Sequence, residues 1–125
     1  MKTEVDKSLF SKLLLRKALA FFSIGFTAIL SIIYFQARKE NRTDFRFVIT
    51  NVHTGINKHV AVENNDEKFN FCNFDSYDAD LIQGDSLVKK AFSKTLFLYR
   101  KDPISNLYKL HLKMKEAGTF PIDWQ

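Results

Sequence analysis

Residues 18–37 read ALAFFSIGFTAILSIIYFQA, and this stretch decides the architecture of the chain. It contains no charged residue, and the basic pairs Arg16-Lys17 and Arg38-Lys39 bracket it. About 20 helical residues are about 30 Å long, which is the thickness of the hydrocarbon core of a bilayer. A helix also pairs its backbone groups within one segment, as lipid requires. The sequence therefore predicts a single transmembrane helix over 18–37.

Two other interpretations of this stretch fit less well. A cleaved signal peptide needs small residues before the cleavage site, and here Phe35 stands where one should be. A helix of a soluble protein that is apolar on every side needs a far larger protein around it than 125 residues provide. The segment is therefore interpreted as an uncleaved anchor.

The basic residues of the chain cluster around the apolar segment. Residues 1–17 hold five basic and two acidic residues, and residues 38–46 hold four and two. Residues 47–125 hold ten of each kind and are neutral. The excess that gives the chain a net charge of +5 thus suits anionic lipid headgroups. Nucleic-acid binding is not expected, because it needs a basic surface on the folded part.

These features divide the chain into four parts. Residues 1–17 form a short cytoplasmic tail, 18–37 the transmembrane helix, 38–44 a polar spacer, and 45–125 an extracytoplasmic β domain with a C-terminal tail. The orientation follows from the slightly larger number of basic residues before the span than directly after it.

Alternating apolar and polar residues predict strands in the part after the spacer. Five or six strands in a meander are expected, as a small barrel or sandwich, and residues 68–74 and 94–100 are two of these strands. The predicted inward-facing residues are Phe45, Phe47, Ile49, Val60, Val62, Phe69, Phe71, Tyr108, Leu110, Leu112 and Met114. The aromatic residues of the tail, Phe120 and Trp124, are expected to pack on the sheet or to form a docking peptide.

Within the span, small and hydroxyl residues share one helix face. Ser23, Thr27 and Ser31 recur every four residues, and Gly25 and Ala28 lie beside them. Small residues let two helices approach closely, and hydroxyls can bond across the contact. The alternative is that each hydroxyl bonds to a carbonyl of its own helix. The stripe is a candidate helix-packing face.

No pattern in the chain predicts a reaction, a cofactor or a metal site. Asp75, Asp78, Asp80 and Asp85 lack the spacing of a calcium loop, and Asp is frequent in turns without metal. His53, His59 and His111 are scattered, and Cys72, without a second cysteine, is expected to be a buried thiol. Ser86 lacks the surroundings of a catalytic nucleophile. The chain is not expected to be an enzyme.

The segment GDSLVK at residues 84–89 resembles uncharacterised small single-pass membrane proteins of Gram-negative bacteria, which carry a similar turn and strand after an N-terminal anchor. The resemblance covers this short motif and the layout of the chain. It implies an extracytoplasmic β domain and no known activity. Together with the orientation expected from the flanking charges, it leads to the expectation of a protein of the bacterial inner membrane, with a cytoplasmic N-terminus and a periplasmic β domain. The triplet Asp85-Ser86-Leu87 also resembles an O-glycosylation acceptor of some of these bacteria.

Two hypotheses for function remain at this stage. The first is a membrane-anchored accessory or scaffold subunit, whose helix packs against other membrane subunits and whose β domain docks on a partner. The alternative is an extracytoplasmic ligand-binding or sensing module with an aromatic-lined pocket. Its candidate docking or pocket residues are Phe69, Phe71, Phe74, Tyr77, Phe97, Tyr99 and Trp124.

Overall fold

The computed structural model describes residues 2–77 and 79–125, with side chains from residue 6 onward. Helix α1 (Lys2–Arg42) extends beyond both ends of the predicted span, because leucine, lysine and arginine on either side favour helix. It is long and apolar enough to cross a membrane. The chain forms two compact units, residues 1–33 and residues 34–125. The last two turns of α1 thus belong to the second unit.

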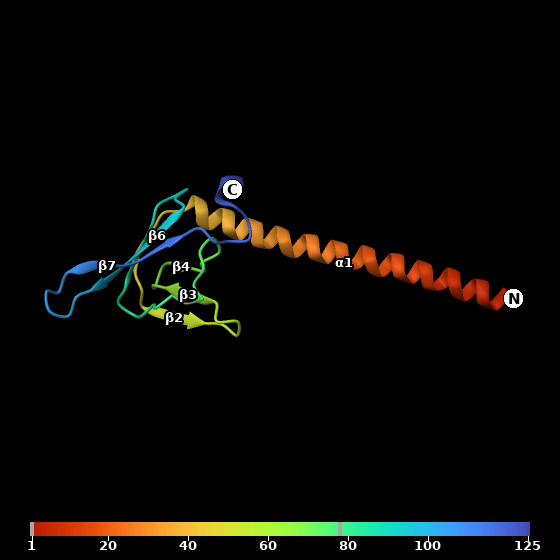
Figure 1. The fold of residues 1–125 in the computed structure, drawn as a ribbon, viewed down its shortest axis with the longest axis horizontal. Coiled ribbons are helices and arrows are strands. Elements are labelled where there is room, and N and C mark those ends of the chain that lie inside the picture. The colour runs from red at the N-terminus through yellow and green to blue at the C-terminus, as the bar shows by residue number, and fades with distance from the viewer. Residues whose placement is uncertain (1, 78) are drawn as a thin grey trace. The chain divides into compact units, whose positions relative to one another are not determined.

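The second unit contains two antiparallel sheets (Figure 1). The first has the strand order β1-β5-β6-β7 and the second β2-β3-β4. The strands are β1 (Phe45–Val48), β2 (Asn51–Thr54), β3 (Val60–Glu63), β4 (Lys68–Phe69), β5 (Ser86–Lys89), β6 (Thr95–Lys101) and β7 (Tyr108–Lys115), and a 3-10 helix, η1 (Ile122–Trp124), follows. The predicted class, one N-terminal helix followed by a small mainly-β domain, is confirmed.

The predicted meander is wrong in one respect, because β1 pairs with β5 and not with β2. The chain changes sheets directly after β1. The Ile49 N–H donates to the Asp85 carbonyl beside the first sheet, and the next N–H, that of Thr50, donates to the Glu63 carbonyl in the second. The neighbouring residues Ile49 and Thr50 therefore connect the first sheet to the second.

The hydrophobic core lies between the sheets. Leu87, Leu96 and Leu98 of the first sheet are fully buried, as are Val62 and Phe69 of the second. The rings of Phe45 and Phe71 both meet the Phe69 ring edge to face, at 4.9 and 4.8 Å. Burying one such side chain stabilises the fold by about 1.5–3 kcal/mol. The inward positions predicted in β1 and β3 are confirmed.

The alternation predicted for β7 breaks at His111. Leu98 pairs with Leu112, but Tyr99 pairs with Leu110, so β7 has one extra residue at this point. A bulge of this kind turns the following side chains to the opposite face. Leu112 and Met114 face the core, whereas Leu110 and Tyr108 share the face of Tyr99 and are 55 and 44 % exposed. The prediction that all four face inward is therefore wrong for two of them.

The strand predicted over residues 68–74 ends at Phe69, and Phe71 has a positive φ of 58°, which lies outside the β region. The expected spacer at 38–44 is also corrected: it is helical to Arg42, and Glu40 and Asn41 are buried. Because residues 38–44 are polar, the sequence did not indicate that Glu40 and Asn41 would be buried.

The segment before η1 crosses the backbone at Cys72 and Asn73 very closely. The Ala117 N–H donates to the Asn73 carbonyl at 2.8 Å. A Cβ on Gly118 would lie 2.6 Å from the Cys72 carbonyl oxygen and 3.0 Å from the Asn73 Cα. Only glycine fits here without a shift of the backbone.

Gly118→Ala is expected to lower the free energy of unfolding by about 1–3 kcal/mol, the usual cost of overpacking. Gly55→Ala is the matched control, because its Cβ would make an ordinary contact of 3.4 Å with the His59 carbonyl. The control should stay within about 0.5 kcal/mol of wild type. Denaturant titration of the full chain in detergent, followed by circular dichroism, measures both. Equal stabilities of the two variants would contradict this close approach.

Candidate docking surface

The first sheet presents one face to the core and a second, here called the outer face, away from it. The outward strand positions alternate with the buried ones and pair across strands, as in Val88 with Phe97 and Tyr99 with Leu110. Val88, Phe97 and Tyr99 are half buried, and Val48 is 41 % exposed. The centre of the outer face is thus apolar and aromatic.

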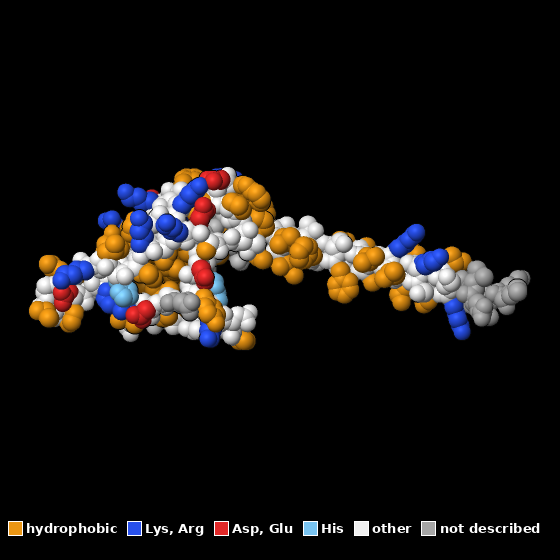
Figure 2. All heavy atoms as spheres, in the orientation of Figure 1, with side chains coloured by type: hydrophobic (Ala, Val, Ile, Leu, Met, Phe, Trp, Pro, Cys, Tyr) orange, Lys and Arg blue, Asp and Glu red, His pale blue; other side chains and the backbone are white. Residues whose placement is uncertain are grey.

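Basic residues surround this apolar centre. Arg46, Lys101, Lys113 and Lys115 occupy outward positions and are exposed. Among the described outward positions of the four strands none is acidic. Figure 2 shows Lys and Arg side chains gathered over the part of the domain where Figure 1 labels β6. The neutral composition of the domain therefore conceals a separation of charge.

Acidic residues near the first sheet pair with bases on its other side. Arg100 donates from Nε and an Nη to the two carboxylate oxygens of Asp85, each at 2.9 Å, and also to Asp80 at 3.0 Å. Asp102 pairs with Lys109 at 2.6 Å. Arg100 and Lys109 occupy inward positions of β6 and β7, Asp85 comes directly before β5, and Asp102 comes directly after β6. Within residues 2–77 and 79–125, no salt bridge joins a carboxylate to Arg46, Lys101, Lys113 or Lys115.

Lys113 adds a cation to the aromatic surface. Its Nζ lies 5.8 Å from the centroid of the Phe97 ring, within the range of a cation–π contact. The rings of Phe97 and Tyr99 lie side by side, with centroids 6.5 Å apart. The arrangement suits a protein surface that brings carboxylates and an apolar centre. It suits a stacked nucleotide base less well, because Lys113 covers one face of the Phe97 ring.

A second polar cluster, here called the junction cluster, joins the end of α1 to the sheets. It consists of Ala37, Glu40, Asn41, Asn73 and Lys89, all of them buried. The Lys89 Nζ donates to the carbonyls of Glu40, Asn41 and Thr43 at 2.8, 3.0 and 3.2 Å. A cation at this position satisfies carbonyls that a helix leaves unpaired at its C-terminus. Burial lowers the pKa of the Lys89 ammonium, and the nearby Glu40 carboxylate opposes that shift.

Glu40 and Asn73 complete the junction cluster. The Glu40 carboxylate accepts from the backbone N–H groups of Cys72 and Asn73 at 3.1 and 3.2 Å. The Asn73 side chain donates to the Ala37 carbonyl at 2.8 Å and accepts from the Gln125 amide at 2.7 Å. The last turns of α1, the segment after β4 and the C-terminal segment are thus bonded together.

The hydroxyl residues of the predicted helix-packing face bond to their own helix. The Thr27 hydroxyl donates to the Ser23 carbonyl and the Ser31 hydroxyl to the Thr27 carbonyl, both at 2.8 Å. All three, with Gly25 and Ala28, are exposed. The local hydrogen bonds that the alternative interpretation expected are therefore present, and the small side chains leave this face open.

The predicted aromatic pocket is not formed. Phe69, Phe71 and Phe74 fill the core, whereas Phe97 and Tyr99 lie on the opposite face of the first sheet. Tyr77 is 55 % exposed beside Lys58, and Trp124 is 68 % exposed near the end of α1. The residues expected to line one cavity are separated because Phe69 of β4 packs into the core, whereas Phe97 and Tyr99 of β6 point away from it. The tail aromatics pack near the helix end and not on the sheet.

Asp75, His53 and His111 have local partners. The Asp75 carboxylate accepts from the Tyr77 N–H, His53 pairs with Glu63, and His111 lies 3.6 Å from Asp80. Asp78 lies outside the described residues. No group of three metal-ligating side chains was found in residues 2–77 and 79–125.

Cys72 and Ser86, the remaining candidate groups, lie in packed surroundings. Burial, with the Glu40 carboxylate nearby, raises the pKa of the Cys72 thiol to about 12, so the thiol is inert at neutral pH. Ser86 is half buried within β5, where it pairs with Tyr99. Neither environment indicates a reactive side chain.

Comparison of the chain with protein-family models, with curated proteins and with solved structures finds no match. The outer face and the junction cluster are therefore interpreted from their own chemistry. The contribution of Leu110 and Tyr108 to the outer face was missed because the bulge at His111 leaves no sequence signal. The junction cluster had one signal, since Asp85, Leu87 and Lys89 alternate as inward positions and place a lysine in the core.

Proposed function

We propose that this protein is an accessory or scaffold subunit of a larger membrane complex, anchored by α1, whose β domain docks on a partner through the outer face. The proposed location is the bacterial inner membrane, with the N-terminus in the cytoplasm and the β domain in the periplasm. The observation that carries the proposal is the outer face, with its apolar centre, basic surround and no acidic strand position.

The charge pattern indicates the chemistry of the partner. A partner surface with Asp and Glu around an apolar centre would pair with Arg46, Lys101, Lys113 and Lys115 while covering Val88, Phe97 and Tyr99. Complementary charge raises the rate of encounter and rejects other surfaces. Burial of the aromatic centre supplies the affinity, as aromatic residues do in many interfaces.

The junction cluster is a second observation that supports the proposal of a docking domain. Burying the charged side chains of Lys89 and Glu40 is unfavourable unless they are fully bonded, and here both are. A domain that is only tethered to a membrane needs no such cluster. A docking domain benefits from it, because a preorganised domain loses less entropy when it binds.

The test is charge reversal on the outer face. The double variant Arg46→Glu and Lys113→Glu should retain at least about tenfold less of the copurifying or crosslinked partner, since facing like charges cost more than 1.4 kcal/mol. Proteins crosslinked in intact cells and extracted in gentle detergent are quantified by mass spectrometry. The double variant should keep the circular dichroism spectrum of wild type, because both side chains are exposed.

The matched control reverses two exposed lysines outside the first sheet. Lys58→Glu and Lys68→Glu make the same change in net charge and should leave the partner bound. Equal loss in both double variants would assign the effect to net charge alone. A wild-type chain that always runs as a monomer, without crosslinked proteins, would contradict the proposed function itself.

A further inference from the structure

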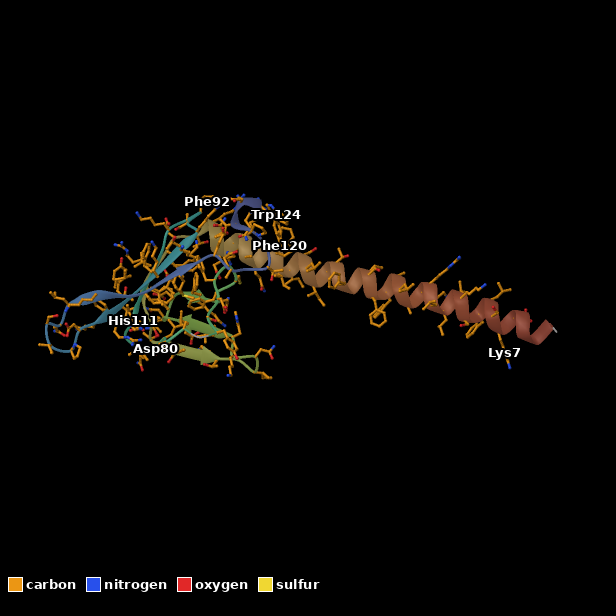
Figure 3. The ribbon with its side chains drawn as sticks, viewed as in Figure 1. Lys7, Asp80, Phe92, His111, Phe120 and Trp124 are labelled. Atoms are coloured by element: carbon orange, nitrogen blue, oxygen red, sulfur yellow. The ribbon has the colours of Figure 1, made fainter. Side chains whose placement is uncertain are left out.

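Aromatic side chains lie beside the last turns of α1, at the end of its apolar stretch and after it. The Tyr34 hydroxyl donates to the Trp124 carbonyl at 2.8 Å, and the Tyr34 and Phe120 rings meet edge to face at 5.3 Å. Trp124 and Phe92 are 68 and 61 % exposed. Phe92, Phe120 and Trp124, here called the aromatic collar, group together in Figure 3 near the end of the helix. They come from two segments far apart in the chain.

Phe92 is exposed, and its backbone has an unfavourable conformation. It has a φ of 60°, a conformation that a bulky residue rarely adopts. Its N–H donates to the Asn41 carbonyl at 2.7 Å, which ties the turn between β5 and β6 to the last turn of α1. This hydrogen bond to the end of α1 offsets the backbone strain at Phe92. The phenyl ring of Phe92 is thereby held away from the core.

Arg42 connects the two halves of the collar. Its guanidinium lies 5.7 Å from the centroid of the Phe92 ring, and it donates to the Gln125 backbone oxygen at 2.8 and 3.1 Å. Arg42 and Lys39 are the basic residues of the last turn of α1, and both are exposed. The collar thus combines exposed rings with cations.

The contacts with Tyr34 indicate what covers these rings. Tyr34 lies near the end of the apolar stretch, so Trp124 and Phe120 lie where that stretch leaves the hydrocarbon. Tryptophan and tyrosine are enriched at this level of membrane proteins, where the ring is apolar and its polar edge meets water. Lysine and arginine beside them attract anionic headgroups. Both features favour lipid over a protein as the occupant.

We propose that the aromatic collar lies in the headgroup region of the bilayer around α1, so that lipid covers Trp124 and Phe92. The inference rests on the proposed function, since it requires that α1 cross a membrane. The β domain would then contact the bilayer through the turn between β5 and β6 and through η1. The outer face would then bind the partner, and the aromatic collar would contact lipid.

Trp124 is the only tryptophan of the chain and reports on its own surroundings. The full chain is reconstituted into vesicles of phosphatidylcholine and phosphatidylglycerol that carry quenchers on the headgroup or at two depths on the acyl chain. Trp124 emission should shift to shorter wavelength than in denaturant. Quenching should be strongest for the headgroup and shallow labels, at least about twofold stronger than for the deep label.

The matched control moves the only tryptophan to the hairpin between β6 and β7. In the double variant Trp124→Phe and Ile104→Trp, the new ring replaces a side chain that is 95 % exposed. Its emission should resemble that of tryptophan in water, and none of the lipid labels should quench it. Phenylalanine at position 124 keeps an aromatic ring in the collar.

The outcomes separate the inference from the proposed function. A chain that remains with the vesicles in alkaline carbonate, but whose Trp124 no lipid label quenches, would overturn the inference and leave the anchor standing. Unquenched emission at short wavelength would show that protein covers Trp124, which also overturns it. A chain that leaves the vesicles in carbonate would refute the anchor itself.

Discussion

Lys89→Met is expected to lower the free energy of unfolding by about 3–5 kcal/mol, because it removes a buried ammonium that several backbone carbonyls share, and each buried polar group left unsatisfied costs about 1–3 kcal/mol. The variant keeps the aliphatic stem but removes the ammonium that donates to Glu40, Asn41 and Thr43. Three carbonyls at the end of α1 then lose this donor, although the Asn41 carbonyl keeps the Phe92 N–H. The Glu40 carboxylate also loses the nearby positive charge.

Denaturant titration of the full chain in detergent measures this change. Lys90→Met is the matched control, because the neighbouring side chain is exposed and should alter the free energy by no more than about 0.5 kcal/mol. A second readout is hydrogen exchange at the amides of Cys72 and Asn73, which donate to Glu40 and should exchange faster in Lys89→Met. Unchanged stability and exchange would contradict the structural role of the junction cluster.

Arg100→Met is expected to have an effect of similar size, about 3–5 kcal/mol, because it leaves the buried Asp85 carboxylate without its cation. Asp85 is 1 % exposed and holds Arg100 through two bonds of 2.9 Å. Pairing with Asp85 raises the pKa of the Arg100 guanidinium above its ordinary value, so the cation persists at every pH of interest. The carboxylate therefore always has its partner in the wild-type protein.

A neutral side chain at position 85 distinguishes this loss of charge from a simple loss of packing. Asparagine carries no charge for burial to penalise, so the loss of stability caused by Arg100→Met should be smaller in the Asp85→Asn background than in wild type. Lys101→Met, the neighbouring exposed substitution, serves as the control in both backgrounds. An equal loss in both backgrounds would indicate that Arg100 acts through its aliphatic stem alone.

The spacing of hydrophobic residues along the sequence predicted much of the fold. The long apolar helix needed only the length and the lack of charge of residues 18–37. The inward positions of β1 and β3 needed only the alternation of Phe45, Phe47, Val60 and Val62, because each strand lies with one side against the core. These features depend on neighbours in the sequence, and they were predictable for that reason.

The candidate sites depend on residues far apart in the chain. Lys89 bonds to carbonyls more than forty positions earlier, and Tyr34 contacts Trp124 ninety positions later. The outer face extends to Leu110 only because His111 is an extra residue in β7. The alternation of inward and outward residues suggested an inward position for Lys89, but it does not identify the groups that Lys89 contacts. On one side of a bulge it also assigns side chains to the wrong face of the strand.

The junction cluster has a consequence for how the domain could be released from its anchor. A protease that cut at the membrane surface, after residue 37, would separate Ala37 from the fragment that contains Asn73. The new N-terminus would begin beside Glu40, whose carboxylate holds two backbone amides. Shedding would therefore damage the domain that it set free. The hydrogen bonds from residues 37 and 40 thus make the folded state of the domain depend on the end of α1.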